Sequence, residues 1–152
     1  MIWWPEQDDN GLVCRHPENA SVRVSRTDCR WRTGRDESRT PFLRQLGWTP
    51  AATDECLVTV DRVFVKYSYA PSAETIQYPR QQKPERVLVS GAQTETCVLA
   101  AGFALFDAGL SPTLVTDRAV GSSLDRSAQP GISLWKHHFR DTTAAAEVLA
   151  TL

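Results

Sequence analysis

The chain has 152 residues, of which 41 % are hydrophobic and 23 % are charged. This composition excludes the low hydrophobicity and high charge of a disordered chain, and the length suits one domain. Seventeen Lys and Arg against eighteen Asp and Glu leave a formal charge of -1, so no global field draws the protein to nucleic acid or to an anionic membrane.

Membrane and secretory segments are not expected. The longest apolar run, 98–106, is far shorter than the roughly 18 residues that a spanning helix needs, and the amino terminus lacks the basic and apolar stretches of a secretory signal. We therefore expect a cytoplasmic protein. The cysteines at 14, 29, 56 and 97 form no C-x-x-C pair, which argues against a zinc site or a disulfide framework.

We predict a single domain covering 1–152, within which two parts of the chain differ in residue pattern. Residues 1–56 contain scattered proline and glycine with little periodicity, which predicts long loops around short strands. Residues 57–152 are more regular and are expected to form the core.

The first regular elements are two strands with a helix between them. The β-branched run 57–65 predicts a strand that ends at Lys66. A helix is expected over 74–82, although Pro79 interrupts its pattern. The short apolar run 86–90 then suits a buried parallel strand.

Alternating elements continue to the end of the chain. A helix is predicted over 94–109, with Thr94 as its cap, followed by a strand over 111–117 and a loop over 119–131. A helical stretch over 132–139 precedes a final segment, 142–152, which is either an Ala-rich helix or a short strand plus a helix. This alternation predicts a parallel sheet with helical crossovers.

Cys97 is the side chain in this pattern that is best placed for chemistry. It follows a strand of the predicted parallel sheet, at the start of a helix, where free amides and the helix dipole favour a thiolate. The same amides can bind the oxyanion that forms when a carbonyl is attacked. A nucleophile and a buried structural cysteine are both compatible with this position.

The residues around Cys97 also carry a family resemblance. The run Val-Leu-Val-Ser-Gly-Ala-Gln-Thr-Glu-Thr-Cys-Val-Leu-Ala-Ala, 87–101, resembles the nucleophile motif of the isochorismatase-like cysteine hydrolases, and 108–109 with 113–123 resembles their next strand and loop. The resemblance implies a three-layer αβα fold of the Rossmann type with a mostly parallel sheet. It further implies an Asp-Lys-Cys triad, a cis peptide between Gly91 and Ala92, a small-molecule substrate, no cofactor and a homo-oligomer.

Lys66 fits the family's lysine, because it ends a strand and precedes Tyr67 and Ser68. In that role it stabilises the thiolate; without the resemblance it is a solvated lysine at a strand end. We expect the backbone amides of Thr96 and Cys97 to form the oxyanion hole.

The family's aspartate is the departure from this pattern. It normally follows a first strand, but no strand-then-Asp pattern precedes Lys66, and Asp8 and Asp9 follow a proline in a loop-like stretch. We therefore expect the first strand and helix of the fold to be lacking. A truncated or mis-started chain, completion of the sheet by another copy, and an inactive relative remain open.

Two further groups of residues, the histidines and an arginine cluster, are not predicted to form a functional site. His16 lacks metal-site spacing, and His137 and His138 face different directions on a predicted helix, so we predict no metal. An arginine cluster could bind anions or RNA, but acidic neighbours dilute it, and a solvated loop or subunit contact is favoured. Its members are Arg23, Arg26, Arg30, Arg32, Arg35, Arg39 and Arg44.

The sequence thus favours a cysteine hydrolase acting on an amide, or on a vinyl ether in the isochorismate manner, through Cys97 and Lys66. The alternative is a catalytically inactive remnant or assembly subunit with the same fold. An RNA-binding role ranks last, and neither nucleic acid nor a membrane is expected as a partner.

Overall fold

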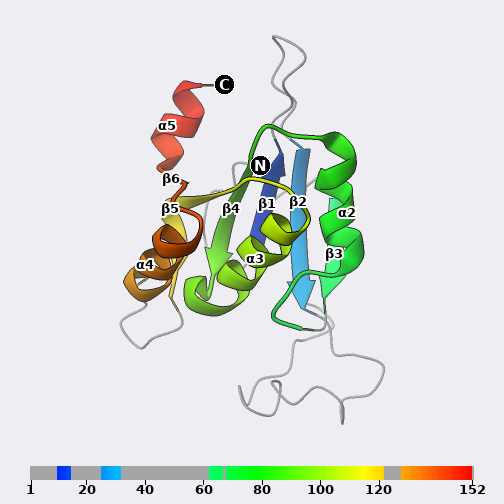
Figure 1. Ribbon diagram of the computed structural model, residues 1–152, viewed down its shortest axis with the longest axis horizontal. Helices are drawn as coiled ribbons and strands as arrows, with labels where there is room; N and C mark the ends of the chain where they lie inside the picture. The colour runs from blue at the N-terminus through cyan, green and yellow to red at the C-terminus, as the bar shows by residue number, and fades with distance from the viewer. Residues whose placement is uncertain (1–9, 15–24, 32–61, 67, 122–127, 152) are drawn as a thin grey trace.

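The computed structural model describes residues 10–14, 25–31, 62–66, 68–121 and 128–151 (Figure 1). Its strands are β1 (Asn10–Cys14), β2 (Ser25–Trp31), β3 (Arg62–Lys66), β4 (Val87–Ala92), β5 (Pro112–Val120) and β6 (Thr142–Thr143). Its helices are α2 (Ala73–Gln82), the π-helical turn η2 (Thr94–Val98), α3 (Leu99–Asp107), α4 (Gln129–His138) and α5 (Ala145–Ala150).

These strands form one sheet in the order β3-β2-β1-β4-β5-β6. The pairs β2–β3, β4–β5 and β5–β6 are parallel, whereas β1 is antiparallel to both of its neighbours, β2 and β4. Five strands therefore point the same way and the strand near the centre points the other way (Figure 1). The predicted mostly parallel sheet is confirmed.

Helices α2, α3 and α4 lie on the same face of this sheet (Figure 1). Helix α2 connects β3 to β4, two strands that β2 and β1 separate in the sheet, while α3 and α4 connect neighbouring strands. Among the described residues, these three helices form one helical layer of the predicted αβα arrangement. None of the described helices has the length and apolar character needed to cross a bilayer.

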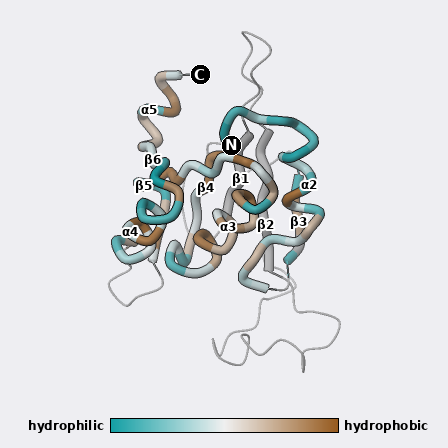
Figure 2. The backbone as a smooth tube through the Cα atoms, in the orientation of Figure 1, coloured by the Kyte–Doolittle hydropathy of each residue, from teal (hydrophilic) through white to brown (hydrophobic). Residues whose placement is uncertain are grey.

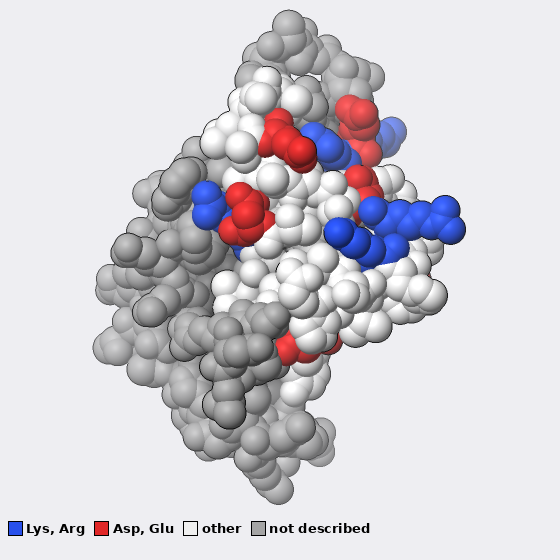
Figure 3. Space-filling view, turned by 90° about the vertical axis from the view of Figure 1, so that its left-hand side faces the viewer, with Lys and Arg blue, Asp and Glu red and all other residues white. Residues whose placement is uncertain are grey.

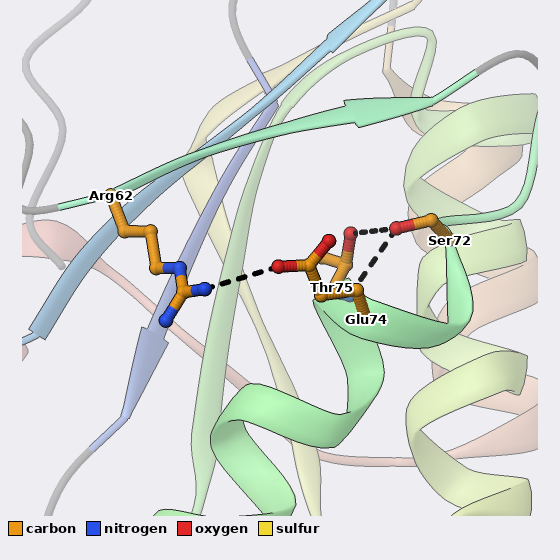
Figure 4. A network of polar contacts seen from close by, with 4 residues as sticks. All are labelled: Arg62, Ser72, Glu74 and Thr75. Atoms are coloured by element: carbon orange, nitrogen blue, oxygen red, sulfur yellow. Dashed lines mark hydrogen bonds and ion pairs between the residues drawn. The ribbon is translucent and has the colours of Figure 1, made fainter.

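Local sequence explains where α2 begins and ends. Ser72 caps its first turn by accepting a hydrogen bond from the Thr75 amide at 3.3 Å, and the two hydroxyls lie 2.8 Å apart (Figure 4). Lys83 ends the helix in the left-handed conformation, with φ 47°. Pro79 is accommodated inside the helix, which therefore extends over the predicted range despite it.

The other predictions for the regular half are also close to the structure. Strands β4 and β5 and helix α4 overlap the expected runs, but β5 ends at Val120 and α4 begins at Gln129, so both take residues from the predicted loop over 119–131. The last segment is a short strand, β6, followed by α5, which is one of the two expected alternatives. Strand β3 begins at Arg62, and residues 57–61 of the predicted strand lie outside the described residues. The predicted helix over 94–109 is divided into η2 and α3.

A hydrophobic cluster joins the sheet to α3 and α4. Its most deeply buried members include Val87, Leu105, Leu114 and Trp135, each 0 % exposed. Trp135 also donates from Nε1 to the Asp141 carbonyl at 2.9 Å, so its one polar atom is satisfied. The hydrophilic connection from α2 to β4 contrasts with the apolar segments of α3 (Figure 2).

Candidate active site at the end of strand β4

The candidate site begins where β4 ends. The register of β4 against β5 shifts between Val89 and Gly91, which marks an irregularity just before the strand stops. Gly91 has φ 134° and Gln93 has φ 60° and ψ 61°, and η2 starts at the next residue. Two residues with positive φ thus turn the chain from the sheet into the helical segment that contains Cys97.

The expected cis peptide between Gly91 and Ala92 is not present: this bond is trans. The prediction was wrong, and the backbone shows how the turn is made without it. Gly91 adopts a positive φ of 134°, which glycine tolerates because it has no Cβ. Gln93 adopts the left-handed conformation, which costs free energy for any residue with a side chain.

Cys97 lies in the fourth position of η2 and is 3 % exposed. Its Sγ donates to the side-chain Oε1 of Gln93 across 3.9 Å. The same Oε1 accepts from the Thr96 hydroxyl at 3.1 Å. Cys97 is therefore at the start of a helical segment, as the sequence predicted, and it is also buried. Its polar neighbour, Gln93, is not among the predicted site residues.

The oxyanion hole differs from the prediction at Thr96. The Thr96 amide donates to the Gln93 carbonyl at 2.9 Å, and the Val98 amide donates to the same oxygen at 3.3 Å. An amide that already has a backbone acceptor is not available to an oxyanion in this conformation. The Cys97 amide stays a predicted donor.

The start of α4 supports η2 from the side. Gly131 is buried, and a Cβ placed on it would lie 2.6 Å from the Glu95 amide nitrogen and from the Thr94 carbonyl carbon. Thr94, the predicted helix cap, instead donates from its hydroxyl to the Val120 carbonyl at 2.9 Å, which ties η2 to the end of β5. The close approach of the η2 backbone explains why residue 131 is a glycine. Nothing in the local sequence predicts this contact.

Lys66 ends β3 at the same edge of the sheet as Cys97, because β3 and β4 run parallel. It is 2 % exposed, and its Nζ donates to the Tyr69 carbonyl at 3.3 Å. Strands β2 and β1 stand between β3 and β4, a separation of about 14 Å at the usual strand spacing.

Residues that could complete a triad or hold a metal are few among the described positions. Asp8 and Asp9 lie outside the described residues. His137 and His138 are exposed in the last turn of α4, at the end away from Gly131. Within the described ranges no three His, Cys, Asp or Glu side chains gather as metal ligands.

The arginine cluster lies largely beyond what the structure describes. Arg26 and Arg30 belong to β2, while Arg23, Arg32, Arg35, Arg39 and Arg44 fall outside the described residues. On the face seen in Figure 3, basic and acidic side chains are interspersed among the described atoms. The described part of that face therefore presents no continuous field of one sign to a polyanion.

Comparison with known proteins adds to this geometry. The family model of the isochorismatase domain matches residues 11–147, which is most of the chain. No curated protein matches.

Three solved structures resemble the fold. A hypothetical protein from Trypanosoma cruzi is 18 % identical with a TM-score of 0.58, over 83 % of this chain and 60 % of its own. An isochorismatase family protein from Desulfovibrio vulgaris is 20 % identical with a TM-score of 0.51, over 66 % and 54 %. N-carbamoylsarcosine amidase from Thermoplasma acidophilum is 13 % identical with a TM-score of 0.57, over 78 % and 70 %. The chain thus spans less than two thirds of the length of the first two.

Proposed function

The chain belongs to the isochorismatase domain family, and from this premise we propose that it is a hydrolase that uses Cys97 to cleave an amide bond in a small molecule. The observation that carries the proposal is the position of Cys97 at the start of the helical segment after β4, within the matched residues. One protein of similar fold is named an amidase, which favours an amide over a vinyl ether as the substrate.

The proposed reaction proceeds by covalent catalysis. The Cys97 sulfur attacks the carbonyl carbon, the C–S bond forms, and the C–N bond breaks as the amine leaves with the thiol's proton. Water then cleaves the thioester, which releases a carboxylic acid and restores the thiol. The Cys97 amide, at the positive end of a helix dipole, is the proposed donor to the oxyanion.

Lys66 is proposed to favour the thiolate by its positive charge. Burial strengthens this effect, because a buried charge is screened less by solvent than an exposed one. Its Nζ donates to the Tyr69 carbonyl at 3.3 Å, and β2 and β1 lie between its strand and β4. Replacement by methionine keeps most of the volume and removes the charge, so Lys66→Met tests this role.

The proposed function is tested by amide hydrolysis. Purified protein is incubated with a panel of small amides and N-carbamoyl compounds, and released ammonia or amine is measured. We expect Cys97→Ala to lower the rate at least about 1,000-fold, while Cys29→Ala, a cysteine of β2, retains it. A Cys97→Ala variant as active as the native protein would overturn the nucleophile assignment.

The inactive alternative has its own readout. Alkylation by iodoacetamide, followed by mass spectrometry, compares Cys97 with Cys14, Cys29 and Cys56 near pH 7, with the unfolded protein as the reference for reactivity without burial. A reactive Cys97 together with hydrolysis supports the enzyme. A Cys97 that reacts no faster than the other three, with no hydrolysis of the panel, supports the inactive remnant or assembly subunit.

A homo-oligomer is also proposed. Phe103 and Phe106 on α3 are 37 % and 57 % exposed and form an aromatic cluster with Phe139. Exposed aromatic side chains of this kind are typical of protein contacts. Light scattering after size-exclusion chromatography measures the mass, and a monomer at micromolar concentration would contradict the proposal.

A further inference from the structure

We infer that Gln93 is a positioning residue for Cys97, whose side-chain amide accepts the thiol hydrogen and, when turned over, donates to the thiolate. The inference rests on the proposed function in taking Cys97 as the nucleophile. It extends that proposal to a residue that neither the predicted triad nor the predicted oxyanion hole contains.

The backbone of Gln93 is the first observation. Of the described residues with a side chain, three have positive φ: Lys83, Gln93 and Arg140. Lys83 and Arg140 follow the ends of α2 and α4, where the left-handed conformation commonly stops a helix. Gln93 instead precedes a helical turn, a place that does not call for this conformation. A strained residue that is not glycine indicates that the side chain is needed there.

The contacts of Gln93 are the second observation. Its Oε1 accepts from the Cys97 thiol at 3.9 Å and from the Thr96 hydroxyl at 3.1 Å. Its backbone carbonyl accepts from the amides of Thr96 and Val98 and, at 3.3 Å, from the Thr96 hydroxyl. The left-handed turn thus directs both the carbonyl and the side chain of one residue onto the segment that carries the sulfur.

The third step follows from hydrogen-bond chemistry. A thiol can donate to the Gln93 oxygen, but a thiolate has no hydrogen to give and would face that oxygen's negative dipole. The terminal torsion of a glutamine is broad and close to two-fold, so a half-turn exchanges the oxygen for the NH2 group. The NH2 group then donates to the thiolate.

Thr96 lowers the free-energy cost of turning the Gln93 amide. Its hydroxyl has two acceptors on Gln93, the side-chain Oε1 at 3.1 Å and the backbone carbonyl at 3.3 Å. When the amide turns over, the hydroxyl keeps the carbonyl as its acceptor. The same pair of residues can therefore satisfy both protonation states of Cys97.

The test measures the rate of Cys97 alkylation by iodoacetamide against pH, read by mass spectrometry. Gln93→Glu keeps the shape but cannot donate and adds a negative charge beside the sulfur. We expect the midpoint of its pH profile to rise by about one pH unit and the rate at pH 7 to fall roughly tenfold. Gln93→Gly removes the amide while suiting the left-handed backbone, and we expect a smaller, several-fold loss.

Lys83→Gly is the matched control, because it relieves the same kind of backbone strain outside η2. A purely structural role for Gln93 would change stability without moving the pH midpoint. Identical midpoints for native protein, Gln93→Gly and Gln93→Glu would overturn the inference. If the native protein hydrolyses nothing yet the midpoints differ as expected, the proposed function fails while the positioning role of Gln93 stands.

Discussion

The two halves of the sheet are built on different plans. In β4-β5-β6, each strand is parallel to the next strand of the chain and a helix joins the pair. In β3-β2-β1, strand β1 runs opposite to the other strands and pairs antiparallel with both β2 and β4. The candidate site lies at β4, where the two plans meet, so its geometry depends on a regular half and an irregular half together.

Trp135→Ala is expected to have the largest effect on stability and tests whether the halves unfold together. The side chain is fully buried in the regular half, and its loss also removes the bond to the Asp141 carbonyl. We expect a loss of about 3–5 kcal/mol in the free energy of unfolding, measured in urea.

Hydrogen exchange separates cooperative from independent halves. Because β1 pairs with β4, we expect the amides of β2 and β4 to lose protection together in Trp135→Ala. Protection that falls in β4 and stays native in β2 would contradict this expectation. Leu134→Ala, at a side chain 42 % exposed on the same helix, is the control and should change stability by about 0.5 kcal/mol or less.

Gly131→Ala is expected to have the next largest effect and tests the contact between α4 and η2. The new Cβ would meet backbone atoms of Thr94 and Glu95 at 2.6 Å, and backbone cannot rotate away. We expect a loss of about 1–3 kcal/mol and a changed rate of Cys97 alkylation.

Gly109→Ala provides the comparison for Gly131. Its Cβ would meet nothing within 4 Å, but φ is +79°, so only backbone strain of about 1–2 kcal/mol is added. Its Cys97 should react at the native rate. An equal change in Cys97 reactivity in both variants would show that loss of stability, and not the contact with η2, alters the site.

Ser72→Ala probes the irregular half with a smaller effect. The variant removes the cap of α2, and we expect a loss of about 1 kcal/mol in chemical unfolding. The neighbouring ion pair between Arg62 and Glu74, at 3.0 Å (Figure 4), joins side chains that are 49 % and 69 % exposed. Glu74→Gln is therefore expected to cost about 0.5 kcal/mol or less, and a larger cost than that of Ser72→Ala would contradict this ranking.

Glu147→Gln is expected to have the smallest effect and concerns acid stability. The Ala144 amide and, secondarily, the Thr143 hydroxyl donate to this carboxylate and hold its pKa below the ordinary value. Its contribution is present above the carboxyl pKa of the unfolded chain and is lost as the pH falls through the lower folded value. The difference in stability between native protein and Glu147→Gln should therefore shrink on acidification, and a constant difference from neutral to strongly acidic pH would contradict this.

Local signals predicted the regular half of the fold well. Short apolar runs located β4 and β5, and the alternation of strands and helices predicted their parallel pairing. The sequence also placed Lys66 at the end of one strand and Cys97 after the end of another, as the structure does. These features follow from neighbouring residues and from the general behaviour of parallel sheets.

The irregular half and the finer site geometry could not be predicted in this way. The direction of β1 depends on pairing with strands 11 or more residues away in the chain, which no single run of residues encodes. Thr94 was expected to cap the helix, but its hydroxyl donates to the Val120 carbonyl in a tertiary hydrogen bond. The left-handed Gln93 precedes the helical segment instead. Contacts between distant segments, rather than local propensity, decide both outcomes.

The reversed direction of β1 decides which of its two ends lies at the edge of the sheet where β4 leads to Cys97. Gly11 pairs with Ser90 and Cys14 with Val87, so β1 begins, rather than finishes, at the edge where β4 leads into η2. At this edge β1 therefore contributes its first residue, Asn10, and not its last, Cys14. Reversing a strand thus exchanges its two flanking segments as sources of chemistry while leaving the order of the sheet intact.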